Sequence, residues 1–103
     1  CLPIKLPYIC EDNNSSWHLF IIQVNECDHL PLFRHLKNKK IGVNLHYIPI
    51  YKHPFYIELY GEMKLKYAEI YYKQSISIPI YFDLTLEEQM KVIDAIKDYY
   101  EKL

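Results

Sequence analysis

The sequence predicts an α+β fold, in which a small antiparallel or mixed sheet has helices packed on it. Two observations support this class. Short segments rich in β-branched and aromatic residues occur at residues 17–24 and 75–80, as expected of strands. Segments with apolar residues at helical spacing lie between them and at the end of the chain. At 103 residues the chain suits one hydrophobic core, so we expect a single domain over residues 1–103.

The composition excludes several classes of protein. Half of the residues are apolar, and 12 basic residues nearly balance 13 acidic ones, which indicates neither disorder nor nucleic-acid binding through bulk charge. No apolar run approaches the roughly 20 residues that span a membrane, and residues 1–7 lack the order of a signal peptide. We therefore expect a cytoplasmic protein with no membrane partner. Cys1, Cys10 and Cys27 form no CxxC pair and are odd in number, so we expect reduced, structural cysteines.

Residues 17–24, WHLFIIQV, predict the first strand. Side chains alternate between the two faces of a strand, and here both alternating sets are apolar. The sets are Trp17, Leu19 and Ile21 on one face, and Phe20, Ile22 and Val24 on the other. We therefore expect this strand to be central in the sheet and covered on both sides.

A helix is predicted to follow this strand. Asp28 can serve as its N-cap, with Pro31 still in the first turn, where proline is tolerated. The basic run at residues 37–40 suits the negative end of the helix dipole, and Gly42 closes the helix. The apolar stripe of this helix consists of Leu32, Phe33 and Leu36.

The next stretch leads from a short β-like segment, residues 41–46, into HYIPIYKHPFY, residues 46–56. Pro49 and Pro54 are incompatible with a regular helix or a central strand in this stretch. We therefore expect residues 46–56 to form a loop that is held in place by its aromatic side chains.

A third helix is predicted at residues 64–73, followed by a strand at residues 75–80 that Pro79 ends. The last helix has the clearest start, because Thr85 and Glu88 fit the capping box. Its predicted apolar stripe is Leu86, Met90, Ile93, Ile96 and Tyr100. The expected order of elements is thus β-α-β-loop-α-β-α.

The histidines and cysteines do not predict a metal site or a hydrolase. His46 and His53 lie seven residues apart across two prolines, and His29 and His35 lie six apart on a helix, so neither pair has the spacing of a helical zinc pair. Cys27 and His29 are neighbours in sequence only, and a buried cysteine beside a helix-start histidine explains them more simply. With only two glycines, Gly42 and Gly61, the chain cannot form the usual phosphate-binding glycine loops.

The eleven tyrosines and four phenylalanines leave two alternatives open. They could stack on nucleic-acid bases, but no basic groove is predicted, so most should fill the core. His46, Tyr47 and Tyr51 differ, because a proline-stiffened loop that leaves a strand holds polar aromatic tips in fixed positions. We expect at least one of these three to face a ligand.

The motifs together resemble one family. In order, the chain carries SWHLF, IGV, HYIPI, PFY, SIPIY and LTLEEQ, at residues 16–20, 41–43, 46–50, 54–56, 77–81 and 84–89. This series resembles the C-terminal small domain of the DegT/DnrJ/StrS nucleotide-sugar aminotransferases over nearly the whole chain. It is most similar to the UDP-4-amino-4,6-dideoxy-N-acetyl-altrosamine transaminases of pseudaminic acid biosynthesis, which are also described as spore coat polysaccharide biosynthesis proteins.

The resemblance implies a fold-type I, pyridoxal-phosphate-dependent enzyme that moves an amino group from glutamate to the 4-keto carbon of a UDP-linked deoxysugar. In this family a lysine bonds to the cofactor, an acidic residue holds the pyridine nitrogen, and hydroxyl and amide groups bind the phosphate. All of these belong to a large domain that is absent from residues 1–103, and none matches a position here. We therefore expect no catalytic residue, no bound cofactor and no activity from this chain alone.

The resemblance also implies a substrate side. The small domain closes over the cofactor cleft and presents the HYIPI loop to the sugar nucleotide, which makes His46 and Tyr47 the first candidates for substrate binding. Tyr51 and His53 follow. The whole enzyme is expected to form a homodimer, largely through its large domain. The alternative is a free-standing module that binds nucleotide sugars or regulates without catalysis, and a third possibility is the remnant of a truncated gene.

Overall fold

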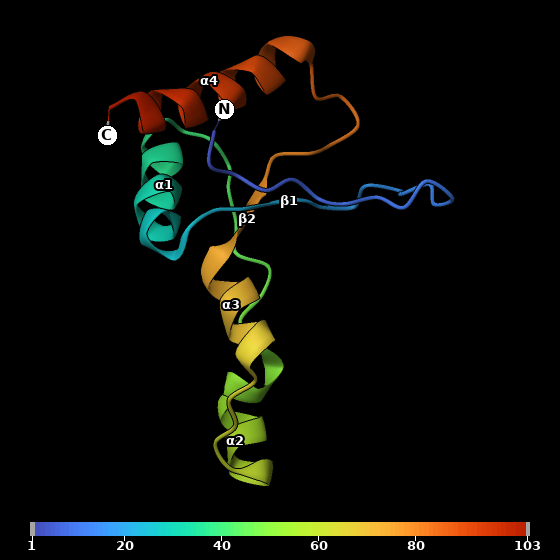
Figure 1. Ribbon diagram of the computed structural model, residues 1–103, viewed down its shortest axis with the longest axis vertical. Coiled ribbons are helices and arrows are strands. Elements are labelled where there is room, and N and C mark those ends of the chain that lie inside the picture. Colours follow the sequence, from blue (N-terminus) through green and yellow to red (C-terminus); the bar gives the residue numbers. More distant parts are fainter. Residues whose placement is uncertain (1, 103) are drawn as a thin grey trace.

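A small antiparallel sheet lies at the centre of the computed structural model, which describes residues 2–102 (Figure 1). Strand β1 (Phe20–Gln23) pairs with β2 (Ser75–Ile78), so that Phe20 lies opposite Ile78. Isolated bridges extend the sheet on both sides, from Lys5 to Gln23 and from Asn44 to Ser77. These pairings confirm the expected α+β class with a small antiparallel sheet. The expected strand at residues 41–46 is wrong, because only the bridge at Asn44 forms there.

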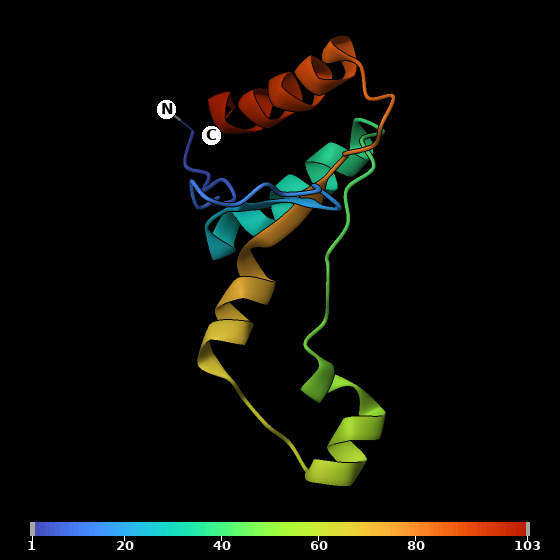
Figure 2. The same ribbon diagram turned by 90° about the vertical axis from the view of Figure 1, so that its right-hand side faces the viewer.

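Two helices pack on one face of this sheet and on each other, α1 (Glu26–Asn38) and α4 (Leu86–Glu101) (Figure 2). Ile22 and Ile76 lie opposite each other in the register and are completely or almost completely buried between the strands and these helices. The buried apolar core consists of Ile22, Val24, Leu32, Leu36, Val43, Ile76, Val92, Ala95 and Ile96. The core therefore unites one face of the sheet with the facing sides of α1 and α4.

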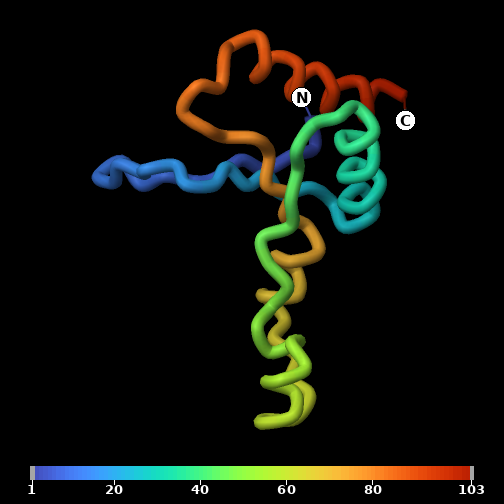
Figure 3. Tube along the Cα trace, turned by 180° about the vertical axis from the view of Figure 1, so that it is seen from behind, coloured from blue at the N-terminus to red at the C-terminus, as the bar shows by residue number. Residues whose placement is uncertain are grey.

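The other face of β1 is open, so the expectation of a strand covered on both sides is wrong. Leu19 and Ile21 on this face are half-buried, and with Tyr71 they line a groove of about 730 Å³. Residues 6–19, which complete the groove, run out from the sheet and return to it (Figure 3). Trp17 stands before the strand with φ of 51° and stacks on Phe20, with ring centroids 5.2 Å apart. The strand is accordingly shorter than predicted.

Helix α1 begins before the predicted cap. Its N-cap is Asn25, and Asp28 lies inside the first turn, where its carboxylate accepts a hydrogen bond of 3.2 Å from the hydroxyl of Tyr99 on α4. A carboxylate engaged in this tertiary contact is not acting as the cap of its own helix. Pro31 consequently lies inside the helix and not in its first turn.

A helical arm, residues 47–74, projects from the sheet (Figures 1 and 2). It contains the 3-10 helix η1 (Ile50–Lys52) and helices α2 (Pro54–Tyr60) and α3 (Lys66–Gln74). The prediction of a loop throughout residues 46–56 is wrong from Ile50 onward. Pro54 occupies the first turn of α2, where its missing amide proton is not needed, so it starts a helix instead of excluding one.

The arm returns to the sheet without a connecting loop, because α3 ends at Gln74 and β2 begins at Ser75. The predictions of a helix at residues 64–73 and of a strand from Ser75 are thus confirmed within a few residues. The strand stops at Ile78, one residue before Pro79, as expected of a residue without an amide donor.

The start of α4 matches the prediction, whereas its buried face matches only in part. The Thr85 hydroxyl accepts a hydrogen bond from the Glu88 amide at 3.2 Å, and the Glu88 carboxylate accepts one from the Thr85 amide at 2.9 Å. Three members of the predicted stripe are exposed, namely Leu86 at 73%, Met90 at 42% and Ile93 at 40%. Ile96 is buried as predicted and Tyr100 packs against the core, but the helix is turned toward α1, so it also buries Val92 and Ala95.

The described cysteines, Cys10 and Cys27, are exposed thiols, and the prediction of a buried Cys27 is wrong. Cys1 lies outside the described residues. His29 is a half-buried residue near the start of α1, with its Nε2 3.0 Å from the carbonyl oxygen of Ser75. Within residues 2–102, no helix combines the length and the apolar character needed to cross a membrane.

Candidate functional site

The candidate site is the segment of residues 46–53, which joins the sheet to the arm. Asn44 fixes its start through two backbone hydrogen bonds to Ser77, of 2.8 and 3.1 Å. The next contact is made by the half-buried His46, whose Nδ1 lies 2.7 Å from the Oγ of Ser77. Ser77 is almost completely buried in β2, so the imidazole is held against the sheet.

Beyond His46 the segment turns its side chains to solvent. Tyr47 packs edge-on against His46, with ring centroids 4.5 Å apart, and is 70% exposed. Ile48 and Ile50 are also exposed, on either side of the half-buried Pro49. The segment thus presents three large side chains that have no core to fill.

The far end of the segment is fixed to α3 by Glu69, which is 7% exposed. The Tyr51 hydroxyl donates a hydrogen bond to its Oε1 at 2.9 Å, and the Lys52 ammonium donates one to its Oε2 at 2.7 Å. Lys52 Nζ also lies 5.8 Å from the ring centroid of Tyr72, one turn further along α3. Both oxygens of the buried carboxylate therefore have partners from the candidate site.

These contacts shift the three pKa values in consistent directions. Hydrogen bonds from Lys52 and Tyr51 lower the pKa of Glu69, and the bond to Glu69 raises the pKa of Lys52. Burial raises the pKa of Tyr51, and its hydrogen bond to Glu69 adds to the effect. Near neutral pH the cluster therefore consists of a carboxylate, an ammonium and a neutral phenol.

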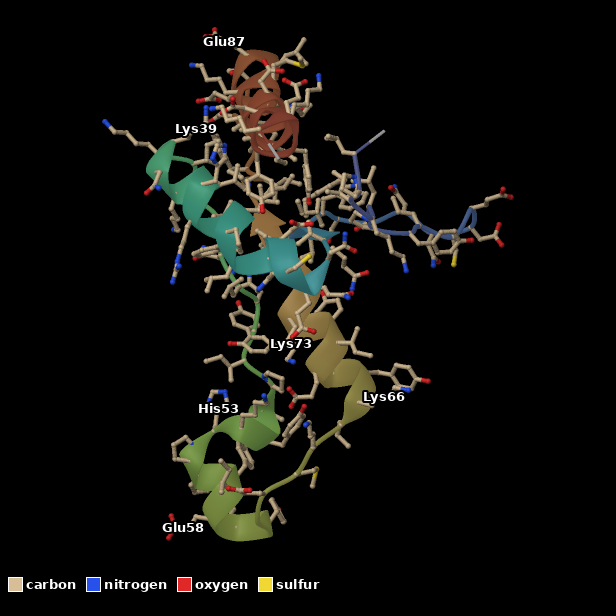
Figure 4. All side chains as sticks on the ribbon, turned by 60° about the vertical axis from the view of Figure 1, so that its left-hand side comes forward. Lys39, His53, Glu58, Lys66, Lys73 and Glu87 are labelled. Carbon is tan, nitrogen blue, oxygen red and sulfur yellow. The ribbon has the colours of Figure 1, made fainter. Side chains whose placement is uncertain are left out.

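The four predicted residues do not converge on one point. His46 and Tyr47 lie together beside the sheet, whereas Tyr51 lies in η1 and contacts α3. His53 is the exposed N-cap residue of α2, and Figure 4 places it at the side of the arm, away from the sheet. None of the four lines the grooves described in residues 2–102.

Sequence reasoning missed Ser77, Lys52 and Glu69. Glu69 had a detectable signal, because in the helix predicted at residues 64–73 it lies next to Ala68 and three residues before Tyr72, on the side expected to be apolar. A carboxylate on such a stripe requires partners, and Lys52 was available in the adjoining segment. Ser77 had no comparable signal, because its partner is far away in sequence.

The acidic and histidine side chains offer no metal site in the part of the chain that the structure describes. No group of three or more His, Cys, Asp or Glu side chains comes close enough together among residues 2–102 to hold an ion. The polar groups that the candidate site and its partners present are hydroxyl, imidazole, ammonium and carboxylate groups.

Comparisons with known proteins agree with one another. Residues 3–97 match the DegT/DnrJ/EryC1/StrS aminotransferase family. The UDP-4-amino-4,6-dideoxy-N-acetyl-β-L-altrosamine transaminase of Campylobacter jejuni is 37% identical over 107 aligned residues, which cover 96% of this chain and 28% of the relative.

Two solved structures share the fold. Helicobacter pylori PseC, an aminotransferase involved in the biosynthesis of pseudaminic acid, superimposes with a TM-score of 0.81 at 27% identity, covering 89% of this chain and 26% of PseC. NtdA from Bacillus subtilis, solved with bound cofactor PMP, superimposes with a TM-score of 0.79 at 26% identity, covering 96% of this chain and 23% of NtdA. This chain thus spans about a quarter of the length of the relatives it matches.

Three of the described lysines, Lys39, Lys52 and Lys73, are paired with carboxylates and offer no free amine to a carbonyl cofactor. A lysine that bonds to a carbonyl cofactor must first lose a proton, and the pKa of Lys52 is raised by its hydrogen bond to Glu69. Lys39 and Lys73 are held in ion pairs of 2.7 Å with Asp98 and Glu26. We therefore assign no step of a cofactor reaction to these three lysines.

Proposed function

The chain belongs to the DegT/DnrJ/EryC1/StrS aminotransferase family, and from this premise we propose that it is the C-terminal small domain of a longer sugar aminotransferase. The whole enzyme would depend on pyridoxal phosphate, held by a large domain outside residues 1–103. It would move an amino group from glutamate to the 4-keto carbon of a UDP-linked deoxysugar. The family match over residues 3–97 is the observation that carries this proposal.

The choice of sugar rests on the agreement between a relative and a solved structure. The Campylobacter jejuni transaminase is named for a UDP-linked 4-amino-4,6-dideoxy sugar, and Helicobacter pylori PseC acts in pseudaminic acid biosynthesis. The cofactor is supported by NtdA, which was solved with bound PMP. We propose the 4-keto form of the same UDP-sugar as the substrate.

We further propose two roles for the residues of the candidate site. Tyr47 and His53, which are exposed, would contact the sugar nucleotide directly. His46 and Tyr51, which bond to Ser77 and Glu69, would present the segment in a defined shape. The chain alone would then be inactive and without cofactor, and the whole enzyme would work as a homodimer. The expected cytoplasmic location stays a prediction.

The first test is to produce the complete polypeptide that carries this sequence, with residues 1–103 alone as the matched control. We expect the complete protein to show the absorbance of bound cofactor and to convert the 4-keto UDP-sugar to the amino sugar, with glutamate as donor. The product is identified by its mass, and the control should show neither signal. A complete protein that binds cofactor but transfers no amino group to this sugar would contradict the proposed substrate.

The intact mass of the endogenous polypeptide tests the domain assignment. A mass several times that of residues 1–103 is expected, because the relatives are about four times as long. A native polypeptide of 103 residues would overturn the proposal, and calorimetric titration with UDP-sugars would then test the free-standing binding module.

A further inference from the structure

Glu69 is a charged residue in a position that an apolar residue would normally fill. Its side chain is buried on α3, and it is not one of the apolar residues that make up the core of the sheet, α1 and α4. A buried carboxylate is unfavourable unless it is paired and hydrogen-bonded. Here both pairing groups, the Tyr51 hydroxyl and the Lys52 ammonium, come from the candidate site.

These bonds are the second of two attachments that hold the segment. The first is at Ser77, which bonds to the backbone of Asn44 and to the imidazole of His46. Between His46 and Tyr51 lie only residues 47–50, and Pro49 restricts the backbone further. A short stretch fixed at both ends has few accessible conformations, so the direction of its side chains is set by the two attachments.

The hydrogen bonds to the Glu69 carboxylate are directional. Each carboxylate oxygen accepts a hydrogen bond from one donor, and the ring of Tyr72, three residues further along α3, lies beside the same ammonium group. An apolar residue at position 69 could pack against the Tyr51 ring, but it would leave the Lys52 ammonium without its carboxylate. A charged pair therefore fixes the register of η1 on α3 where an apolar contact would allow sliding.

We propose that Glu69 is a positioning residue, whose buried carboxylate holds Tyr51 and Lys52 so that residues 47–50 keep the shape that meets the sugar nucleotide. This inference rests on the proposed function of the segment. It assigns to α3 a part in substrate recognition, although no side chain of α3 was predicted to take part. Glu69 itself does not touch the substrate.

The test uses the complete enzyme with Glu69→Ala and Glu69→Gln. The control is Glu58→Gln, which changes an exposed carboxylate on α2 of the same arm. We expect Glu69→Ala to raise the KM for the sugar nucleotide by about tenfold or more, since displaced binding groups lose much of their effect. The half-reaction with the amino donor, followed by cofactor absorbance, should change by less than about twofold, because it does not need the sugar site.

The conservative variants separate positioning from general stability. Glu69→Gln keeps an acceptor for Tyr51 and loses the charge that holds Lys52, so its KM should lie between those of the wild type and Glu69→Ala. Tyr51→Phe combined with Glu69→Ala should add little to the effect of Glu69→Ala alone, since both remove one contact. Equal loss in the donor half-reaction and in the sugar reaction would overturn the inference, as would an unchanged KM in both Glu69 variants.

Hydrogen exchange gives a second measurement that needs no activity. Glu69→Gln should speed amide exchange in residues 50–53 and leave α1 and α4 unchanged, whereas Glu58→Gln should change neither. If the complete enzyme accepts no sugar nucleotide, the proposed function fails. Faster exchange confined to residues 50–53 would still establish the attachment, and unchanged exchange there would overturn it.

Discussion

Two serines on one strand show how much a single hydroxyl contributes when it has a partner. Ser75 and Ser77 are both 4% exposed and lie on the same face of β2. The Ser77 hydroxyl lies 2.7 Å from His46 Nδ1, whereas the Ser75 hydroxyl is buried without a hydrogen-bond partner among the described residues. The two positions therefore form a matched pair in burial and differ in hydrogen bonding.

We predict that Ser77→Ala lowers the free energy of unfolding by about 1–3 kcal/mol, because it leaves the half-buried imidazole nitrogen of His46 without its bond. Ser75→Ala should be neutral or slightly stabilising, because it removes a buried hydroxyl that is not paired. Urea unfolding of the two variants measures both changes. Equal destabilisation by the two substitutions would show that the bond to His46 contributes nothing.

At the scale of elements, helices α1 and α4 are joined by a charged cluster beside the core. The carboxylate of Asp98 on α4 lies 2.7 Å from the ammonium groups of Lys102 and Lys39, and Lys39 caps the end of α1 (Figure 4). Hydrogen bonds from Lys102 and Lys39 lower the pKa of Asp98 to about 2. His35 of α1 adds a contact, with its Nε2 3.0 Å from the carbonyl oxygen of Ala95.

The sign of the resulting pH dependence follows from the lowered pKa. The Asp98 carboxylate stabilises the fold fully above the pKa of an unfolded aspartate, about 3.9, and this stabilisation is lost as the pH falls toward 2. We predict that the difference in the free energy of unfolding between the wild type and Asp98→Asn is largest above about pH 5. The difference should shrink between about pH 4 and about pH 2, the range between the unfolded and folded pKa values of Asp98. Asp94→Asn is the control on the exposed side of α4. A difference that stays constant down to pH 2 would contradict the assignment.

The elements also show which features can be predicted from sequence. The capping box of Thr85 and Glu88 was predictable because both partners lie within one turn of the same helix. The buried face of α4 was predictable only in part, at Ile96 and Tyr100, because the rotation of the helix is set by contact with α1 and not by the most regular stripe in its own sequence. Pro54 was misread because proline disrupts a helix interior but suits a helix start.

In the candidate site, too, features set by neighbouring residues differ from features set by contacts between distant elements. The segment was chosen as a candidate from its prolines and polar aromatic residues, which are contiguous in the sequence, and its role in binding stays a prediction. Its attachments were not, because Glu69 lies 17 residues from Lys52 and Ser77 lies 31 from His46. Hydrogen bonds across such separations depend on the fold that brings the elements together.

At the scale of the whole molecule, the arm makes the chain more extended than a compact domain. The radius of gyration is 15.7 Å, against about 13 Å for a compact chain of 100 residues. No residue of α2 is buried, and Phe55, Leu59 and Tyr60 are exposed at 63%, 57% and 72%. The end of the arm therefore has little of the apolar burial that stabilises a helix.

We predict that the backbone amides of α2 exchange with solvent much faster than those of α1 and β2 in the isolated 103-residue chain. A helix without buried residues opens locally, whereas α1 and β2 open only with the core. Hydrogen exchange read by mass spectrometry or NMR measures the difference, with α1 as the helical reference. Protection of α2 equal to that of α1 would show that the arm is stabilised by contacts other than burial.

The direct passage from α3 into β2 has a mechanical consequence. The C-terminal end of the arm, α3, continues directly into β2. The residues that lead into its N-terminal end, Asn44 and His46, are hydrogen-bonded to Ser77 of the same strand. Because both ends of the arm are attached to β2, bending at its base would break these hydrogen bonds, and we expect the arm to turn together with the sheet. We therefore expect a rotation of the sheet to displace the end of the arm in proportion to the length of the arm, and to carry residues 46–53 with it.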